Sequence, residues 1–252
     1  MPVRLAAVGL GNRTTKYLKY VKDHPERVVL TYVADIDERR VETVRRQFGL
    51  PRERCFAGGE LLLAAAPEDI DAVIIGSPDF THRDFALEAI SHSYHVLLEK
   101  PVGLDASQTR EIADAARDAG VLIGVCYVLR YKKYYSILRR LSRRENLGGL
   151  ISISHTTDIG VDRTLHSYVR GPWNVSEMGS PVFLSKCCHD VDIALWLTDA
   201  KPVSVLSRTA ARFFVAENAP SEAADRCLDC PLEGECPYSA VDLYLRRHDW
   251  IA

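Results

Sequence analysis

The fold is decided by the opening stretch of the chain, Val3-Arg4-Leu5-Ala6-Ala7-Val8-Gly9-Leu10-Gly11-Asn12-Arg13-Thr14. An apolar run that breaks at two glycines and continues into an amphipathic segment predicts a strand, a glycine turn and a helix. Gly9 permits the tight turn, and Gly11 lets the backbone approach a pyrophosphate that the helix N-terminus would bind. Thr14 stands where the third glycine of G-x-G-x-x-G would be, so we expect helix and strand to pack slightly less closely.

A second apolar run, Val28–Ala34, ends at Asp35. An acidic residue roughly 20 residues beyond the glycines is placed to bind the adenosine ribose of a dinucleotide. A carboxylate there also repels a 2′-phosphate, which predicts NAD as the cofactor, with NADP less favoured. Arg39 and Arg40 follow closely and would soften that preference, unless they lie on the exposed face of a helix over residues 37–48.

Four further strands are predicted in the first half, each preceded by a helical segment, at residues 54–57, 71–75, 95–98 and 121–125. Six β/α units are the number in the Rossmann dinucleotide-binding fold, which predicts such a domain over residues 1–126. Beyond it, alternating runs at 150–156 and 203–209 predict half-buried strands. Residues 127–252 are therefore expected to form an α+β domain with a largely antiparallel, open sheet.

Composition places the chain among ordinary globular proteins. It has 252 residues, 47% of them hydrophobic, with 32 basic and 34 acidic side chains and a net charge of -2. So small a charge gives no basic field to attract nucleic acid. No apolar stretch approaches the roughly 20 residues of a membrane span. Met1-Pro2 leads straight into the first strand without a signal-peptide pattern, so a cytoplasmic protein is expected.

Seven cysteines at scattered positions, an odd number, favour reduced thiols over a disulfide framework. Three of them form the pattern Cys227-x-x-Cys230 followed by Cys236. The C-x-x-C spacing suits zinc, but a structural zinc site has four ligands, and the fourth would have to be His248 or a distant group. We predict packed free thiols and no bound metal, with zinc as the alternative.

The most specific motif in the chain is Glu99-Lys100-Pro101, a charged pair and a proline at the end of the fifth predicted strand. Together with Gly9-x-Gly11 and the helical segment around His189, it resembles the Gfo/Idh/MocA oxidoreductases, the glucose-fructose oxidoreductase and inositol dehydrogenase family, over essentially the whole chain. The resemblance implies an NAD-dependent enzyme acting on a secondary hydroxyl of a sugar, polyol or related compound. Lys100 would then lie beside the nicotinamide and the reacting hydroxyl.

The resemblance also implies the remaining site residues. The expected catalytic set is Lys100, His189 and Asp192. Many relatives carry an aspartate four residues before the histidine, where this chain has Ser185. If a helix begins at Lys186, then Ser185, His189 and Asp192 share one face, and Asp192 is expected to orient His189. The residues expected at the cofactor are Gly9, Gly11, Asn12, Arg13, Asp35, Ser77, Pro78, His82, Glu99 and Lys100. Those expected at the substrate are His166, Arg170, Trp173, Ser185 and Lys186.

The resemblance leaves alternatives open. Some relatives use transient nicotinamide oxidation to cleave glycosidic bonds, so the alternatives are an NAD-dependent glycoside hydrolase and a non-catalytic cofactor-binding sensor or partner protein. Family second domains present an open sheet to a neighbouring subunit, which implies a homodimer or homotetramer. The residues after Ala210 are too few to complete such a sheet, so the second domain is expected to be incomplete.

Overall fold

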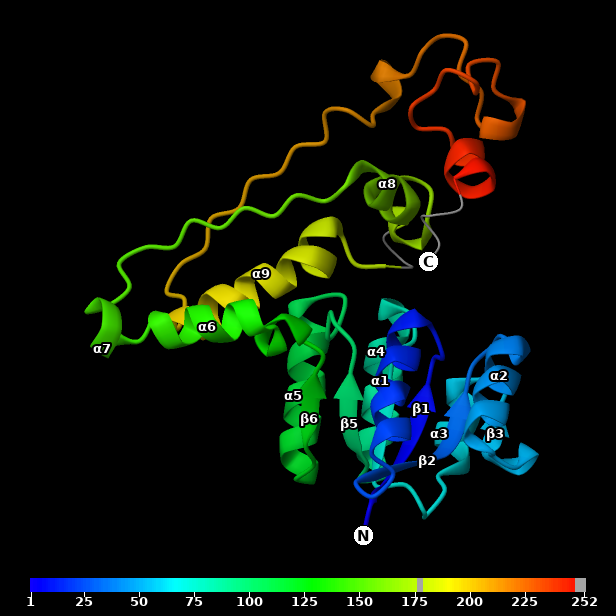
Figure 1. The fold of residues 1–252 in the computed structure, drawn as a ribbon, viewed down its shortest axis with the longest axis vertical. Helices are drawn as coiled ribbons and strands as arrows, with labels where there is room; N and C mark the ends of the chain where they lie inside the picture. Colours follow the sequence, from blue (N-terminus) through cyan, green and yellow to red (C-terminus); the bar gives the residue numbers. More distant parts are fainter. Residues whose placement is uncertain (176–178, 248–252) are drawn as a thin grey trace.

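The computed structural model describes residues 1–175 and 179–247. Its core is a six-stranded parallel sheet with strand order β3-β2-β1-β4-β5-β6 (Figure 1). The strands are β1 (Val3–Val8), β2 (Val28–Ala34), β3 (Cys55–Phe56), β4 (Ala72–Ile75), β5 (His95–Leu98) and β6 (Ile123–Val125). This is the strand order of a Rossmann fold, so the predicted α/β architecture of the first half is confirmed.

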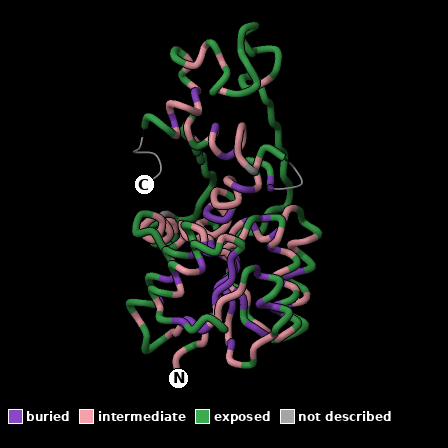
Figure 2. The backbone as a smooth tube through the Cα atoms, turned by 90° about the vertical axis from the view of Figure 1, so that its right-hand side faces the viewer, coloured by how far each residue is buried: buried purple, intermediate pink, exposed green. Residues whose placement is uncertain are grey.

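Helices cover both faces of the sheet. They are α1 (Asn12–Asp23), α2 (Glu38–Phe48), α3 (Gly59–Ala65), α4 (His82–Ser91) and α5 (Ala106–Ala119). Residues of β1 alternate between two cores, because successive side chains of a strand point to opposite faces. Leu5 and Ala7 pack with α1 and α2, whereas Ala6 and Val8 pack with α3, α4 and α5. Figure 2 shows the buried residues concentrated along these strands.

The turn between β1 and α1 is built on glycine. Gly9 has φ +79, a left-handed conformation that L side chains rarely adopt, and a Cβ there would lie 2.5 Å from the Ser77 nitrogen. Thr14, at the third glycine position, is fully buried against the end of β4. It fits because residue 76 is itself a glycine, whose Cβ would lie 2.1 Å from the Thr14 hydroxyl.

The second half contributes four α-helices to the described chain: α6 (Lys133–Leu141), α7 (Arg144–Leu147), α8 (Val161–Thr164) and α9 (Val182–Thr198). Helix α9 lies above the carboxyl end of the sheet, next to α6 (Figure 1). It begins four residues before Lys186, because Pro181 takes the N-cap position and proline is tolerated at a helix start.

The predicted antiparallel sheet of the second half is not present in the described residues. Segments 150–156 and 203–209 run extended but are not paired as strands (Figure 1). A half-buried strand needs a neighbouring strand for its backbone groups and a layer to cover its apolar face. Here Ile151 and Val203 are fully exposed. The sheet surface expected to hold a dimer or tetramer is therefore also missing, and the oligomeric state stays a prediction.

We expect Gly9→Ala to destabilise the chain more than Gly120→Ala. Both glycines have positive φ, but only at Gly9 does the added methyl meet backbone atoms, while nothing lies within 4 Å at Gly120. Each substitution forces a left-handed alanine at about 1–2 kcal/mol, and the clash at Gly9 adds roughly 1–3 kcal/mol. Urea unfolding of both variants measures the difference, and equal losses would contradict the close approach of the turn to Ser77.

Candidate active site

The glycine turn and Asp35 form one hydrogen-bonded unit. The N–H of Leu10 donates to Asp35 Oδ2 at 2.6 Å, and the N–H of Asp37 donates to Oδ1 at 2.8 Å. Arg40 Nη1 lies 3.8 Å from Oδ2. The buried carboxylate therefore holds the first βα turn against the end of β2, a structural role that the spacing argument did not predict. Each oxygen keeps a further lone pair that a ribose hydroxyl can use.

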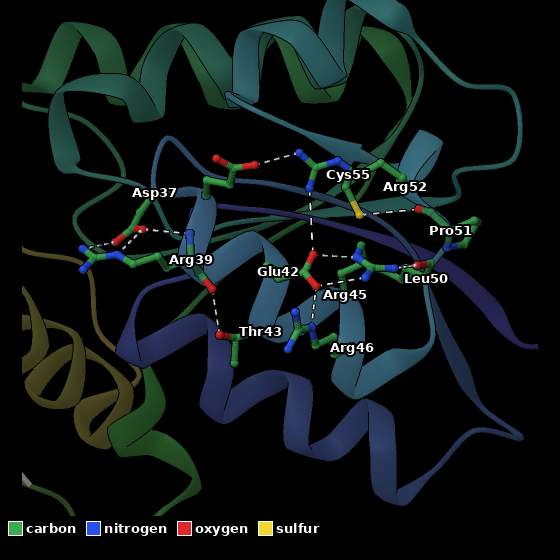
Figure 3. Close-up of polar contacts among 11 residues, drawn as sticks. Asp37, Arg39, Glu42, Thr43, Arg45, Arg46, Leu50, Pro51, Arg52 and Cys55 are labelled. Carbon is green, nitrogen blue, oxygen red and sulfur yellow. Dashed lines mark hydrogen bonds and ion pairs between the residues drawn. The ribbon is translucent and has the colours of Figure 1, made fainter.

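Arg39 is exposed, and no ion pair joins it to Asp35 in the described chain. Its guanidinium pairs with Asp37, the N-cap of α2, and Glu42 of the same helix binds Arg45 and Arg46 (Figure 3). These two arginines hold the pKa of Glu42 at about 2. Arg39 thus belongs to the exposed helix face, as the second interpretation of this pair proposed, whereas Arg40 reaches Asp35.

The start of α1 has the features of a pyrophosphate site. Gly11 takes the N-cap position, where no side chain caps the helix, and a Cβ at Gly11 would meet nothing within 4 Å. The first turn carries no acidic residue, and Asn12 and Arg13 are exposed on it. Uncapped N–H groups, the positive end of the helix dipole and an arginine together suit the phosphates of a dinucleotide.

The end of β5 is fixed by the buried carboxylate of Glu99. It accepts hydrogen bonds from the Lys100 N–H at 3.0 Å and from the Tyr17 hydroxyl on α1. Arg13 Nε lies 3.8 Å from the same carboxylate. Burial and this hydrogen bond raise the pKa of Tyr17. The network ties α1 to the strand end and so sets the direction in which Lys100 leaves the sheet.

The Lys100 side chain extends from the end of β5 to helix α9. Its Nζ donates a hydrogen bond of 2.8 Å to the backbone carbonyl of Ser185. The Ser185 side chain is used elsewhere, because its Oγ lies 2.5 Å from the Tyr168 hydroxyl. Lys186, the next residue, has its ammonium 5.7 Å from the centre of the Tyr168 ring. Burial, and then the charges of Lys100 and Arg163, lower the pKa of Lys186.

His189 lies one turn further along α9, half buried. Its Nδ1 is buried and has no hydrogen-bond partner among the described residues. Burial and then the positive charge of Lys100 lower its pKa below the usual 6.5. The ring of Tyr127 packs against it with the centroids 5.9 Å apart. At neutral pH the His189 imidazole is therefore uncharged, and its Nδ1 has no hydrogen-bond partner in the described chain.

The prediction that Asp192 orients His189 is wrong. Asp192 binds Arg130 through two hydrogen bonds, of 2.8 Å from Nε and 2.5 Å from Nη2. Arg130 also lies over the Trp196 ring, 5.8 Å from its centroid. A buried carboxylate takes the strongest available donor, and the bidentate guanidinium fork exceeds a neutral imidazole in this respect. The pair instead fastens α9 to the segment after β6.

The loop after β4 is braced by His82. Its Nδ1 lies 2.7 Å from the Pro101 carbonyl and its Nε2 lies 3.0 Å from the Ser77 carbonyl. The side chain is 1% exposed. His82 therefore joins the Ser77-Pro78 loop to the Lys100-Pro101 loop and does not present a surface to a ligand. Ser77 Oγ pairs with Thr81 Oγ1 at 2.6 Å.

Three of the expected substrate residues serve internal contacts. Trp173 donates from Nε1 to Asp79 at 2.9 Å, His166 Nδ1 lies 2.9 Å from the Tyr244 hydroxyl, and Arg170 donates to the Tyr238 carbonyl. Their partners lie 68 to 94 residues away along the sequence. Because local sequence patterns do not indicate such distant contacts, these pairs could not be predicted from the sequence.

The cysteines remain free thiols in the described chain. Within residues 1–175 and 179–247, no group of three or more metal-binding side chains is placed to hold an ion. His248, the fourth ligand considered for Cys227, Cys230 and Cys236, lies outside the described residues. In the same part of the chain, no helix is long and apolar enough to cross a membrane.

A family model described as an oxidoreductase family with an NAD-binding Rossmann fold, GFO_IDH_MocA, matches residues 3–127. Residues 3–127 therefore belong to the Gfo/Idh/MocA family. Inositol 2-dehydrogenase of Pseudarthrobacter chlorophenolicus is 28% identical over 154 residues, 61% of this chain and 44% of that protein. Glucose-6-phosphate 3-dehydrogenase of Bacillus subtilis is 30% identical over 124 residues, 49% of this chain and 33% of that protein.

The solved myo-inositol 2-dehydrogenase of Lactobacillus plantarum has the same fold, with a TM-score of 0.66 at 21% identity, over 81% of this chain and 58% of that chain. The chain spans about half the length of these relatives. The family match confirms the predicted NAD-binding Rossmann domain.

Acidification should destabilise the chain less once His189 is replaced. A histidine with a lowered pKa in the folded state binds its proton more readily when unfolded, so it contributes stability above pH 6.5 that is lost as the pH falls through its folded pKa. We therefore expect His189→Gln to lose less stability than the parent between pH 7 and pH 5. Urea unfolding across this range tests it, with pH 8, where the imidazole is neutral in both states, as the internal control. Parallel stability curves would contradict the burial of this imidazole.

Proposed function

We propose that the chain is an NAD-dependent oxidoreductase that acts on a secondary hydroxyl of a sugar, polyol or related compound. The observation that carries the proposal is the contact of Lys100 with α9 one turn before His189, at the carboxyl end of β5. In parallel α/β sheets, ligands bind at this edge. Two relatives are named as dehydrogenases of an inositol and of a glucose phosphate, both hydroxylated rings.

The cofactor would be held by groups from the ends of four strands, β1, β2, β4 and β5. The first turn of α1, with Gly11 and Arg13, suits the pyrophosphate, and Asp35 suits the adenosine ribose. The Ser77-Pro78 loop and the Glu99-Lys100 strand end border the same edge, braced by His82. Residues 127–252 would supply the substrate side of the site through α9.

Bound NAD⁺ would supply the acceptor for the hydride of the substrate carbon, so the hydroxyl proton would have to pass to a base of the protein. His189 suits this role, because its lowered pKa leaves it uncharged at pH 7. Lys100 uses one of its ammonium N–H groups on the Ser185 carbonyl and has two others for the substrate oxygen. A cation at that oxygen stabilises the negative charge that develops as the proton leaves.

Replacing Lys100 should stop turnover without removing the cofactor. We expect Lys100→Ala to lower turnover by roughly 10²–10³-fold, the effect of losing one group that stabilises charge in the transition state, and to leave NAD affinity nearly unchanged. Turnover of a panel of sugars and polyols is followed at the NADH absorbance band, and NAD affinity by calorimetry. Lys19→Ala, on the exposed face of α1, is the matched control. An active Lys100→Ala variant would refute the assigned role, and an inactive parent chain that still binds NAD would favour the sensor.

The parent chain should bind NAD more tightly than NADP. Asp35→Ser removes the carboxylate that repels a 2′-phosphate. We therefore expect it to lower the ratio of NAD affinity to NADP affinity about tenfold, which is the effect of one strong charge contact. Arg40, whose Nη1 lies 3.8 Å from Asp35, would attract that phosphate. Arg40→Ala should therefore raise the ratio of NAD affinity to NADP affinity. Arg39→Ala is the matched control, because Arg39 pairs with Asp37. Calorimetric titration that finds NADP preferred by the parent would overturn the assignment.

A further inference from the structure

A pocket of about 330 Å³ opens beside the proposed catalytic groups. It lies between α8, α9 and the segment before α8, and its walls include Leu129, Ile159, Arg163, Lys186, His189 and Asp190. The volume suits a single small ligand or one group of a larger one. Because His189 forms part of its wall, a molecule whose hydroxyl reaches His189 extends into this pocket.

Two cations of this pocket are without a carboxylate partner. Neither Arg163 nor Lys186 forms an ion pair within 4 Å in the described chain, although 23 such pairs are formed by other residues there. Lys186 contacts the Tyr168 ring, and its backbone neighbour Ser185 accepts the hydrogen bond from Lys100. Two positive groups, Arg163 and Lys186, therefore line the pocket, and the Lys100 ammonium lies nearby at the Ser185 carbonyl.

The carboxylates of the pocket do not neutralise this charge by contact. Asp190 Oδ1 accepts hydrogen bonds from His155 Nε2 and from the Thr157 hydroxyl, each at 2.8 Å. Asp158, the other acid in the wall, is exposed and makes no ion pair in the described chain. Burial, and then repulsion by the charges of Lys100 and Arg163, lower the pKa of Lys186. An anion that entered would relieve this repulsion.

We propose that this pocket binds an anionic group of the substrate, a carboxylate or a phosphate, between the Arg163 guanidinium and the Lys186 ammonium. Arginine matches the paired oxygens of either group with its planar fork, and lysine adds a mobile point charge. The inference rests on the proposed function, because it places the neutral, hydroxylated part of the same molecule against Lys100 and His189. The substrate class is then an acidic or phosphorylated sugar or polyol.

The pocket differs from the phosphate site proposed for the cofactor. The pyrophosphate is assigned to the first turn of α1, with Arg13, whereas Arg163 and Lys186 come from α8 and α9 of the second half. Substitution of Arg163 or Lys186 should therefore leave NAD affinity unchanged.

The test uses the full chain saturated with NAD and titrated calorimetrically with glucose, glucuronate, glucose 6-phosphate and inorganic phosphate. At least one of the two anionic sugars is expected to bind ten or more times more tightly than glucose. Arg163→Gln and Lys186→Gln should each remove about tenfold of that preference, the effect of one charged hydrogen bond. Arg110→Gln, an exposed arginine on α5, is the matched control. Thermal unfolding and NAD affinity verify that each variant is folded.

The ligands separate the possible sources of the anion. Preference for glucuronate alone identifies a carboxylate site, and preference for glucose 6-phosphate, with weak binding of inorganic phosphate, identifies a phosphate site. Equal binding of all three sugars, no binding of either anionic sugar, or an anion preference that survives both substitutions would overturn the inference. NADH formation is measured in a separate experiment. Binding of an anionic sugar without NADH formation would refute the proposed oxidation but not the anion site. NADH formation without a preference for anionic sugars would refute the anion site but not the proposed oxidation.

Discussion

The hydrogen bond from the Lys100 ammonium to the Ser185 carbonyl joins the two halves of the proposed site, at 2.8 Å. It depends on the buried Glu99 carboxylate, which holds the Lys100 backbone and is itself held by Tyr17 of α1. Burying the Glu99 carboxylate without hydrogen-bond partners would cost free energy. The contacts among Tyr17, Glu99 and Lys100 therefore stabilise one another. The helix that begins the cofactor site is in this way coupled to the group proposed to act on substrate.

Positive charge gathers where ligands are expected. Arg13 at the start of α1 and Lys100 at the end of β5 lie at the carboxyl edge of the sheet, and Arg163 of α8 and Lys186 of α9 line the neighbouring pocket. The whole chain is nearly neutral, with a net charge of -2, so this is a local arrangement. Burial, and then the positive charge of Lys100, lower the pKa of both Lys186 and His189, which favours an uncharged histidine beside the reacting hydroxyl.

The first half could be predicted from the sequence because its signals are local: continuous apolar strands, amphipathic helices and a glycine turn. The position of Lys100 followed from strand order, since the carboxyl ends of parallel strands share one edge. The partner of Asp192 could not be predicted, because it lies 62 residues away in Arg130. The alternating run at 150–156 predicted a strand, but alternation specifies a face and not the neighbour that a strand requires.

The central claim is that Lys100 and His189 flank the reacting end of the cofactor at the carboxyl edge of β5. A crystal structure of the chain with NAD⁺ tests it most directly. The account predicts the pyrophosphate at the first turn of α1, the adenosine ribose on Asp35, and the nicotinamide ring in contact with the Lys100 side chain and facing His189. A nicotinamide ring that points away from Lys100, or a cofactor bound outside the β1–α1 turn, would contradict it.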